Sequence, residues 1–151
     1  MNPAATPPRC DDARVARIVA LFESLTPADT ARLGDFYAAD VRFKDPFNEV
    51  QGVAEVQRIF AHMFVALNTP RFVVRDIIVQ GDQCFLSWDF VFRFKRFSSD
   101  LQTVRGASHL VFDAKGLVSL HHDYWDAAEE LYEKLPAIGA LMRWLKRRAN
   151  A

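Results

Sequence analysis

Residues 84–96 of the chain read CFLSWDFVFRFKR, and every even position from Cys84 to Phe94 carries an apolar or aromatic side chain. Such alternation is the pattern of a β-strand that buries one of its faces. The opposite face of this strand is largely polar, with Ser87, Asp89, Arg93 and Lys95. The aromatic stripe fits either a hydrophobic core or the wall of a ligand cavity.

The period-two pattern continues on both sides of this segment. Strands are predicted over residues 71–80, 84–96, 102–113 and 117–126, separated by the turn signals GDQ, SSD and DAKG. A shorter strand is predicted over residues 41–45 and ends at Asp45-Pro46. The strands of the second half are joined by short turns, so they form antiparallel hairpins.

Helical spacing of apolar residues surrounds the predicted strands. It predicts helices over residues 11–25, from Thr26-Pro27 to about Ala39, after Gly52, over 127–134, and from Pro136 to about Arg148. Helices followed by a run of hairpin-connected strands indicate a segregated α+β fold. A long sheet that curls around a few helices leaves a wedge in which a ligand can bind.

Length and composition restrict the class of protein. The 151 residues suit one domain, and 19 basic residues balance 19 acidic ones, so no general attraction to nucleic acid is expected. Cys10 and Cys84 form no disulfide or metal framework, and no signal peptide or membrane span is visible. We expect a soluble, cytoplasmic protein with a flexible arm over residues 1–10, a domain over 11–128 and a helical extension over 129–151.

The short strand over 41–45 offers the first candidate catalytic residue. Val41, Phe43 and Asp45 share one face, while Arg42 and Lys44 share the other. Because a basic face must be solvated, Asp45 is expected on the inner face, where a carboxylate can act as a general base. The alternative is a local role, in which Asp45 accepts hydrogen bonds from the backbone of the turn that follows.

The last predicted strand offers two more candidates. His121 and Asp123 lie two positions apart, so they share one face of the strand and can share a polar pocket. The histidine could move a proton near neutral pH, and the aspartate could orient it. Alternation does not decide whether this face points inward. His62 and His109 are isolated and are interpreted as structural, so metal binding is only weakly supported.

Two segments carry a resemblance to a known superfamily. Residues 36–47, FYAADVRFKDPF, followed by Gly52, resemble a segment of the ketosteroid isomerases. FDAKG at 112–116, followed by HDYW at 122–125, resembles the closing hairpin of the nuclear-transport-factor-2-like superfamily, which includes SnoaL-like polyketide cyclases. The resemblance implies a cone of three N-terminal helices packed in a strongly curved, mostly antiparallel sheet, with a pocket at its open end, and it implies a homodimer.

The resemblance also assigns positions to individual residues. It places Asp45 where the isomerases keep their general base and Trp125 where they keep a pocket tryptophan, and it turns His121 and Asp123 towards the cavity. The isomerases' oxyanion-hole tyrosine corresponds to Leu21 or Phe22, and their protonated aspartic acid to a position near Ser108. The arginine of the related limonene-epoxide hydrolases corresponds to a position near Trp88. Neither of these two arrangements is carried over.

The sequence therefore predicts cofactor-independent acid–base chemistry on a hydrophobic small molecule, of the cyclase, isomerase, dehydratase or hydrolase type. Asp45, His121 and Asp123 are the candidate catalytic residues, and no metal or cofactor is expected. The candidate substrate-binding residues are Phe22, Phe43, Phe60, Met63, Trp88, Phe90, Ser108 and Trp125. The alternatives are a non-catalytic module that binds an apolar ligand and a dimeric scaffold.

The C-terminal extension has two interpretations. Acidic residues precede a basic end, and an apolar seam runs from Leu131 to Leu145 with Trp144 near its edge. The segment either packs across its own domain or a dimer partner, or it is a basic amphipathic helix that lies on an anionic membrane surface.

Overall fold

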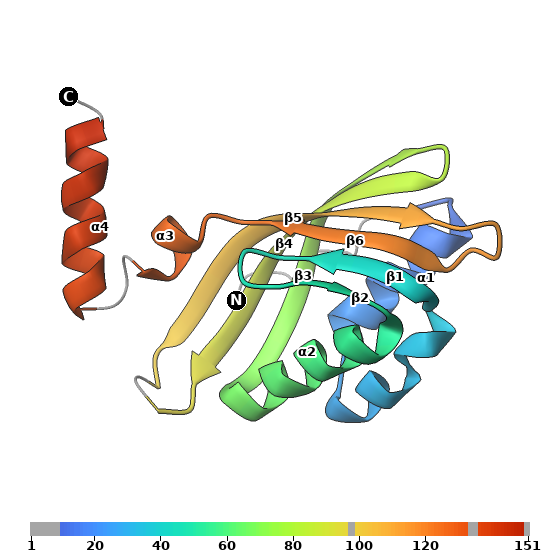
Figure 1. The fold of residues 1–151 in the computed structure, drawn as a ribbon, viewed down its shortest axis with the longest axis horizontal. Helices are drawn as coiled ribbons and strands as arrows, with labels where there is room; N and C mark the ends of the chain where they lie inside the picture. Colours follow the sequence, from blue (N-terminus) through green and yellow to red (C-terminus); the bar gives the residue numbers. More distant parts are fainter. Residues whose placement is uncertain (1–9, 97–98, 133–135, 150–151) are drawn as a thin grey trace, which may run out of the picture.

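The computed structural model describes residues 10–96, 99–132 and 136–149 of the chain. Figure 1 shows the elements in chain order. They are α1 (Ala13–Ser24), the 3-10 helix η1 (Pro27–Asp35), β1 (Tyr37–Lys44), β2 (Glu49–Gln51), α2 (Val53–Ala66), β3 (Leu67–Gln80), β4 (Gln83–Phe94), β5 (Leu101–Phe112), β6 (Val118–Tyr124), α3 (Ala127–Glu130) and α4 (Pro136–Ala149).

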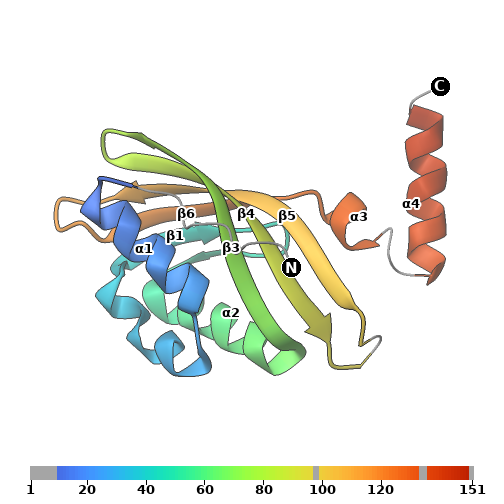
Figure 2. The same ribbon diagram turned by 180° about the vertical axis from the view of Figure 1, so that it is seen from behind.

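Within the described residues, the strands form one six-stranded sheet in the order β2-β1-β6-β5-β4-β3. Neighbouring strands are antiparallel except β1 and β6, which run parallel. The sheet curves around α1, η1 and α2, which lie on its concave side in both views (Figures 1 and 2). This arrangement confirms the predicted α+β cone.

The hydrophobic core lies between the concave face of the sheet and the helices. Val15, Ile18 and Phe22 are buried on one side of α1, and Val56 and Phe60 are buried on α2. The even positions of β4 complete this core, as their alternation predicts, and Cys84, Leu86, Trp88 and Phe92 are all buried. The helices therefore fill the narrow part of the cone, and a cavity lies at its wide end.

The structure corrects the predicted helix that ends near Ala39. η1 ends at Asp35, and β1 begins at Tyr37. The cause is tertiary, because Tyr37 pairs with Val118 of β6 and the backbone N–H of Val118 donates to the carbonyl of Phe36. The short strand β2, which the sequence analysis did not predict, pairs with the end of β1.

The two ends of the chain differ from their predictions in detail. Residues 1–9 of the predicted flexible arm lie outside the described residues, while Cys10 is half-buried and packs against the core. Cys10 and Cys84 are both free thiols. At the other end, α3 stops at Glu130 instead of continuing to residue 134, and residues 133–135 are not described.

α4 stands apart from the cone in both views (Figures 1 and 2). The structure therefore does not show this helix packed across its own domain. Among the described residues, no helix is long and apolar enough to cross a bilayer.

An apolar cavity with an aspartate at its floor

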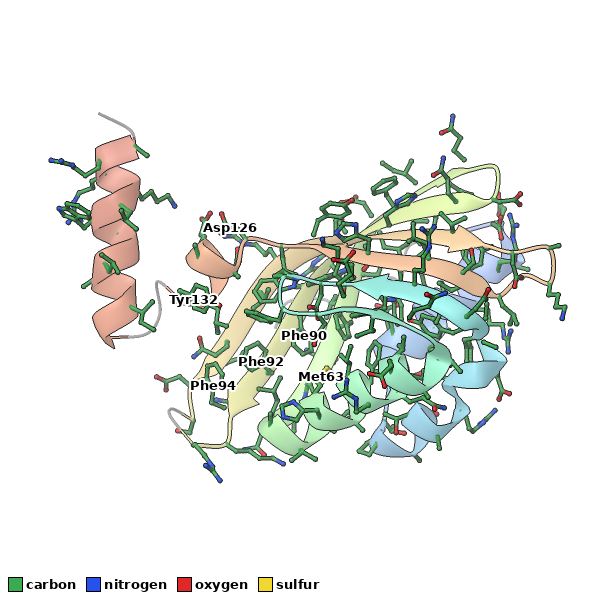
Figure 3. The ribbon with its side chains drawn as sticks, in the orientation of Figure 1. Met63, Phe90, Phe92, Phe94, Asp126 and Tyr132 are labelled. Carbon is green, nitrogen blue, oxygen red and sulfur yellow. The ribbon has the colours of Figure 1, made fainter. Side chains whose placement is uncertain are left out.

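The wide end of the cone contains a cavity of about 310 Å³. Its lining is almost entirely apolar and aromatic and comes from both the helices and the sheet. Figure 3 shows Phe90, Phe92 and Phe94 of β4 projecting to the concave side, towards Met63 of α2. The lining residues are Phe43, Asp45, Phe47, Ile59, Phe60, His62, Met63, Ala66, Leu67, Phe72, Trp88, Phe90, Phe92, Phe94, Val104, Asp123, Trp125 and Leu131.

Stacked rings form one wall of the cavity. The rings of Phe72 and Phe90 lie 4.5 Å apart, centroid to centroid, and Phe72 meets Trp88 edge-on at 5.4 Å. Trp88 lies across its strand neighbour Gly106, where a β-carbon would come within 2.5 Å of the indole ring. The absence of a side chain at Gly106 therefore makes room for the indole.

Asp123 is the polar group at the floor of this cavity. Its Oδ1 accepts a hydrogen bond from the Ser108 hydroxyl at 2.5 Å and contacts His121 Nε2 at 2.7 Å. Ser108 in turn accepts a hydrogen bond from Trp88 Nε1 at 2.9 Å. Within the described part of the chain, no side chain or backbone group donates to Asp123 Oδ2, and Asp123 lines the cavity.

His121 lies behind Asp123, buried on the concave side of β6 with 2% of its surface exposed. Its Nδ1 is 2.8 Å from the Tyr37 hydroxyl, and its ring packs 4.8 Å from that of Phe43. Burial and the charge of Asp123 raise the pKa of Tyr37 well above its ordinary value, so this hydroxyl stays protonated.

Both ring nitrogens of His121 have a hydrogen-bonding partner. Nδ1 faces the Tyr37 hydroxyl, which can either donate to it or accept from it, and Nε2 faces the Asp123 carboxylate. The network runs from Tyr37 through His121 and Asp123 to Ser108 and Trp88.

Asp45 lies at the rim of the cavity, directly after β1. Its Oδ1 accepts hydrogen bonds from the backbone N–H groups of Phe47 at 2.8 Å and Asn48 at 2.6 Å. The side-chain amide of Asn48 donates to both carboxylate oxygens. Both alternatives predicted for Asp45 therefore apply in part, because its carboxylate stabilises the local turn and also lines the cavity.

The structure brings most of the predicted substrate-binding residues to the cavity. The six that line it are Phe43, Phe60, Met63, Trp88, Phe90 and Trp125. Phe22 and Ser108 lie in a buried layer behind the floor, together with His121. Of the three predicted catalytic residues, Asp45 and Asp123 line the cavity, while His121 lies behind the lining residues Asp123 and Phe43.

Several lining residues were not among the predicted substrate-binding residues. Phe92 and Phe94 belong to the aromatic stripe of β4 that alternation predicts as core or cavity wall, and they line the cavity beside Phe90. Phe72 lies on β3, whose register shifts interrupt strict alternation. His62, interpreted from sequence as structural, lies at the exposed end of α2 and lines the cavity. Tyr37 was missed because a helix was predicted there.

The described residues form no candidate metal site. Among them, no group of three or more His, Cys, Asp or Glu side chains could hold a metal ion.

Solved structures of several proteins share this fold. A protein of ketosteroid isomerase-like fold from Catenulispora acidiphila, in complex with trimethylamine, is 18% identical (TM-score 0.68, covering 83% of this chain and 92% of the other). TsrD from Streptomyces laurentii is also 18% identical (TM-score 0.68, 85% and 99%). An LEH-like epoxide hydrolase from M. tuberculosis is 13% identical (TM-score 0.64, 78% and 85%).

At these identities the structural matches establish the fold alone. No curated protein sequence matches the chain. The family model of the SnoaL-like domain matches residues 18–121, more than half of the chain. The chain therefore belongs to the family of SnoaL-like domains.

Proposed function

We propose that the cone binds an apolar, ring-bearing small molecule and that Asp123 acts on it as a general base. The observation that carries this proposal is the position of the Asp123 carboxylate in a largely apolar cavity, where His121 and Ser108 hold it. Burial of a charge is costly unless hydrogen bonds compensate it, and such groups concentrate at functional sites.

The geometry leaves one oxygen of Asp123 available for chemistry. Oδ1 receives both hydrogen bonds, so the carboxylate is fixed in orientation while Oδ2 can take a proton from a ligand in the cavity. From a carbon acid next to a carbonyl, the proton moves to Oδ2 and the C–H electron pair forms an enolate. Return of the same proton to a different carbon completes an isomerisation.

With an epoxide as substrate, the same base would activate a water molecule for hydrolysis. Oδ2 takes a proton from water as the water oxygen bonds to a ring carbon and the carbon–oxygen bond of the epoxide breaks. The alkoxide then takes the proton back from Oδ2, and the product is a diol. The fold similarity to an LEH-like epoxide hydrolase supports the inclusion of this substrate class.

His121 and Tyr37 act as positioning residues in this proposal. They lie behind the carboxylate and hold its orientation through Nε2–H, without reaching the ligand. Asp45 is the second carboxylate at the rim, where its hydrogen bonds to the turn restrict its movement.

One observation favours a second candidate, a non-catalytic module that binds an apolar ligand. Trp88 Nε1 donates to Ser108, and the Tyr37 hydroxyl is buried against His121 Nδ1 at hydrogen-bond distance, so neither group points to a ligand as an oxyanion donor. A cavity of this size suits a drug-sized apolar ligand with or without chemistry.

The Asp123→Asn variant separates the two candidates. If Asp123 is the base, turnover of a responsive substrate from a panel of cyclic ketones and epoxides falls by about a hundredfold or more, while ligand binding persists. Asp126→Asn is the matched control, because Asp126 is exposed and caps α3 without lining the cavity (Figure 3).

Other results identify the alternative. Unchanged turnover in Asp123→Asn with a larger loss in Asp45→Asn moves the base to the rim. Tight ligand binding with no turnover of any substrate in the panel identifies a binding module.

A further inference from the structure

α4 exposes a continuous apolar stripe. Ile138, Leu141 and Leu145 recur at intervals of three and four residues, so they share one side of the helix. These side chains are 45–51% exposed, and Trp144 beside them is 47% exposed. Because α4 stands apart from the cone in both views, nothing among the described residues covers this stripe (Figures 1 and 2).

The rest of α4 is cationic. Residues 136–149 contain four basic side chains and no acidic one, namely Arg143, Lys146, Arg147 and Arg148. Arg143 and Arg147 lie on the side opposite the apolar stripe, since residues four apart share a face. Arg148 instead continues the spacing of the stripe at the end of the helix, and its guanidinium lies 5.3 Å from the centre of the Trp144 ring. An apolar side with a tryptophan and a basic opposite side are typical of helices that lie in the surface of an anionic membrane.

The cavity mouth lies at the same end of the molecule. The end of the β4–β5 hairpin, α3 and α4 all lie at this end in Figures 1 and 2. Phe47, Trp125 and Leu131 line the mouth, and Phe47 is 54% exposed. Only residues 133–135 separate Tyr132 from α4, so the chain can span at most about 15 Å between them.

The rim that carries α4 is fixed to the sheet. Arg105 of β5 contacts the buried carboxylate of Glu130 in α3 at 2.9 Å. Asp126 caps α3 by accepting hydrogen bonds from two backbone N–H groups of its first turn. Lys146 of α4 lies 3.8 Å from the carboxylate of Glu129 in α3. A surface that binds α4 would therefore be held close to the cavity mouth.

We propose that α4 docks the cone on an anionic membrane surface and thereby holds the cavity mouth beside the bilayer. The ligand class that follows is an apolar molecule dissolved in the membrane, and this part rests on the proposed function of the cavity. The apolar stripe supplies the insertion and the four basic residues supply attraction to anionic headgroups.

Charge favours a membrane over a second copy of α4. A second copy of α4 packed on the apolar stripe would add four more basic side chains and no acidic residue, so it would leave the charge of the opposite side without compensation. An anionic headgroup layer instead compensates the same charges. The end of the β4–β5 hairpin adds Arg93, Lys95 and Arg96 at the same end of the cone.

Vesicle sedimentation with the full chain tests the proposal. We expect binding to vesicles of phosphatidylcholine with phosphatidylglycerol at three to one, little binding to phosphatidylcholine alone, and weakening as salt rises. Leu141→Gln is expected to weaken binding by about tenfold, because the stripe loses an inserted side chain. Ala140→Gln is the matched control, since the neighbouring Ala140 lies outside the stripe, and its binding should remain within about twofold.

Three results would overturn the proposal. They are no binding to the anionic vesicles, equal binding of Leu141→Gln and Ala140→Gln, and light scattering in which Leu141→Gln converts a dimer to a monomer. Asp123→Asn should bind vesicles like the unchanged protein. Leu141→Gln should no longer bind vesicles but should still turn over a water-soluble substrate. Loss of vesicle binding then tests membrane docking, and turnover tests the proposed function of the cavity separately.

Discussion

At the scale of single residues, Gly106 decides where Trp88 lies. Its hydrogen atom leaves the space that the indole ring occupies, and the indole N–H then reaches Ser108. Ser108 holds Asp123, so a backbone position without a side chain contributes to the orientation of the candidate base.

Gly106→Ala is therefore expected to displace Trp88. The added β-carbon would overlap the ring, and such overpacking typically costs about 1–3 kcal/mol of unfolding free energy. Urea denaturation measures the cost, and near-ultraviolet circular dichroism reports the indole environment. Gly34→Ala is the control, because a β-carbon at Gly34 meets nothing within 4 Å. Equal stability of the two variants would show that the sheet accommodates a methyl group at Gly106 at no cost.

Asp45 shows both the reach and the limit of single-residue inference. Alternation correctly buries Val41 and Phe43 and exposes Arg42 and Lys44. β1 ends one residue before Asp45, however, and the turn that follows binds its carboxylate through two backbone amides. Periodicity predicts the face of a strand residue, but it carries no information about hydrogen bonds beyond the strand end.

At the scale of elements, α1 is attached to the sheet through charged side chains at its start. Asp12 caps the helix by accepting from the backbone of Arg14 and Val15, and it also binds the Arg14 guanidinium at 2.8 Å. Arg14 reaches on to Asp82 in the β3–β4 turn at 2.7 Å. The hydrogen bond from Arg14 is the main cause that lowers the pKa of Asp12 to about 2.

This pKa predicts how stability depends on pH. A carboxyl whose pKa is lower in the folded chain stabilises it fully above the unfolded value of about 4, and this contribution is lost as pH falls towards 2. Asp12→Asn keeps a capping oxygen but loses the charge, so we expect about 1 kcal/mol less stability at pH 7 and a smaller difference near pH 2, where about half of the folded carboxyl groups are protonated. Urea denaturation at both pH values measures this, with the exposed Asp11→Asn as control. A difference as large at pH 2 as at pH 7 would assign the effect to the cap instead of the ion pair.

Element types were more predictable from sequence than element ends. The four long strands and the helices α1 and α2 follow their hydrophobic periods because each buries one face. The segment from Phe36 to Ala39 is different, because its pairing with β6, which lies about 80 residues later, overrides local propensity. Tyr37, the partner of His121, could not be identified for this reason.

At the scale of the whole molecule, the convex face of the sheet is the unexplained surface. Ile78, Phe85 and Tyr124 on this face are 43–67% exposed, and the Phe85 ring stacks on His109 at 4.4 Å. Exposed apolar groups on one face indicate an interaction surface. The homodimer implied by the family resemblance is expected to use this face.

Light scattering tests that expectation. The unchanged protein should have twice the chain mass of 17.2 kDa, and Phe85→Lys should shift it towards the monomer. The expected weakening is about tenfold or more, because a buried aromatic side chain would become a charge. Val65→Lys, at an exposed apolar position on α2, should leave the mass unchanged. A monomeric unchanged protein, or equal masses for the two variants, would remove the convex face as the dimer interface.

The parallel pairing of β1 with β6 also has a consequence for synthesis of the chain. β1 is made early, but its partner, Val118–Tyr124, is among the last parts of the cone to leave the ribosome. Until β6 is available, β1 has no partner at this edge and the aromatic face of the sheet is not enclosed. A nascent chain in this state is prone to aggregate. Closure of the cone therefore waits for residues 118–124, and a nascent chain that pauses before residue 118 is the form for which molecular chaperones would compete.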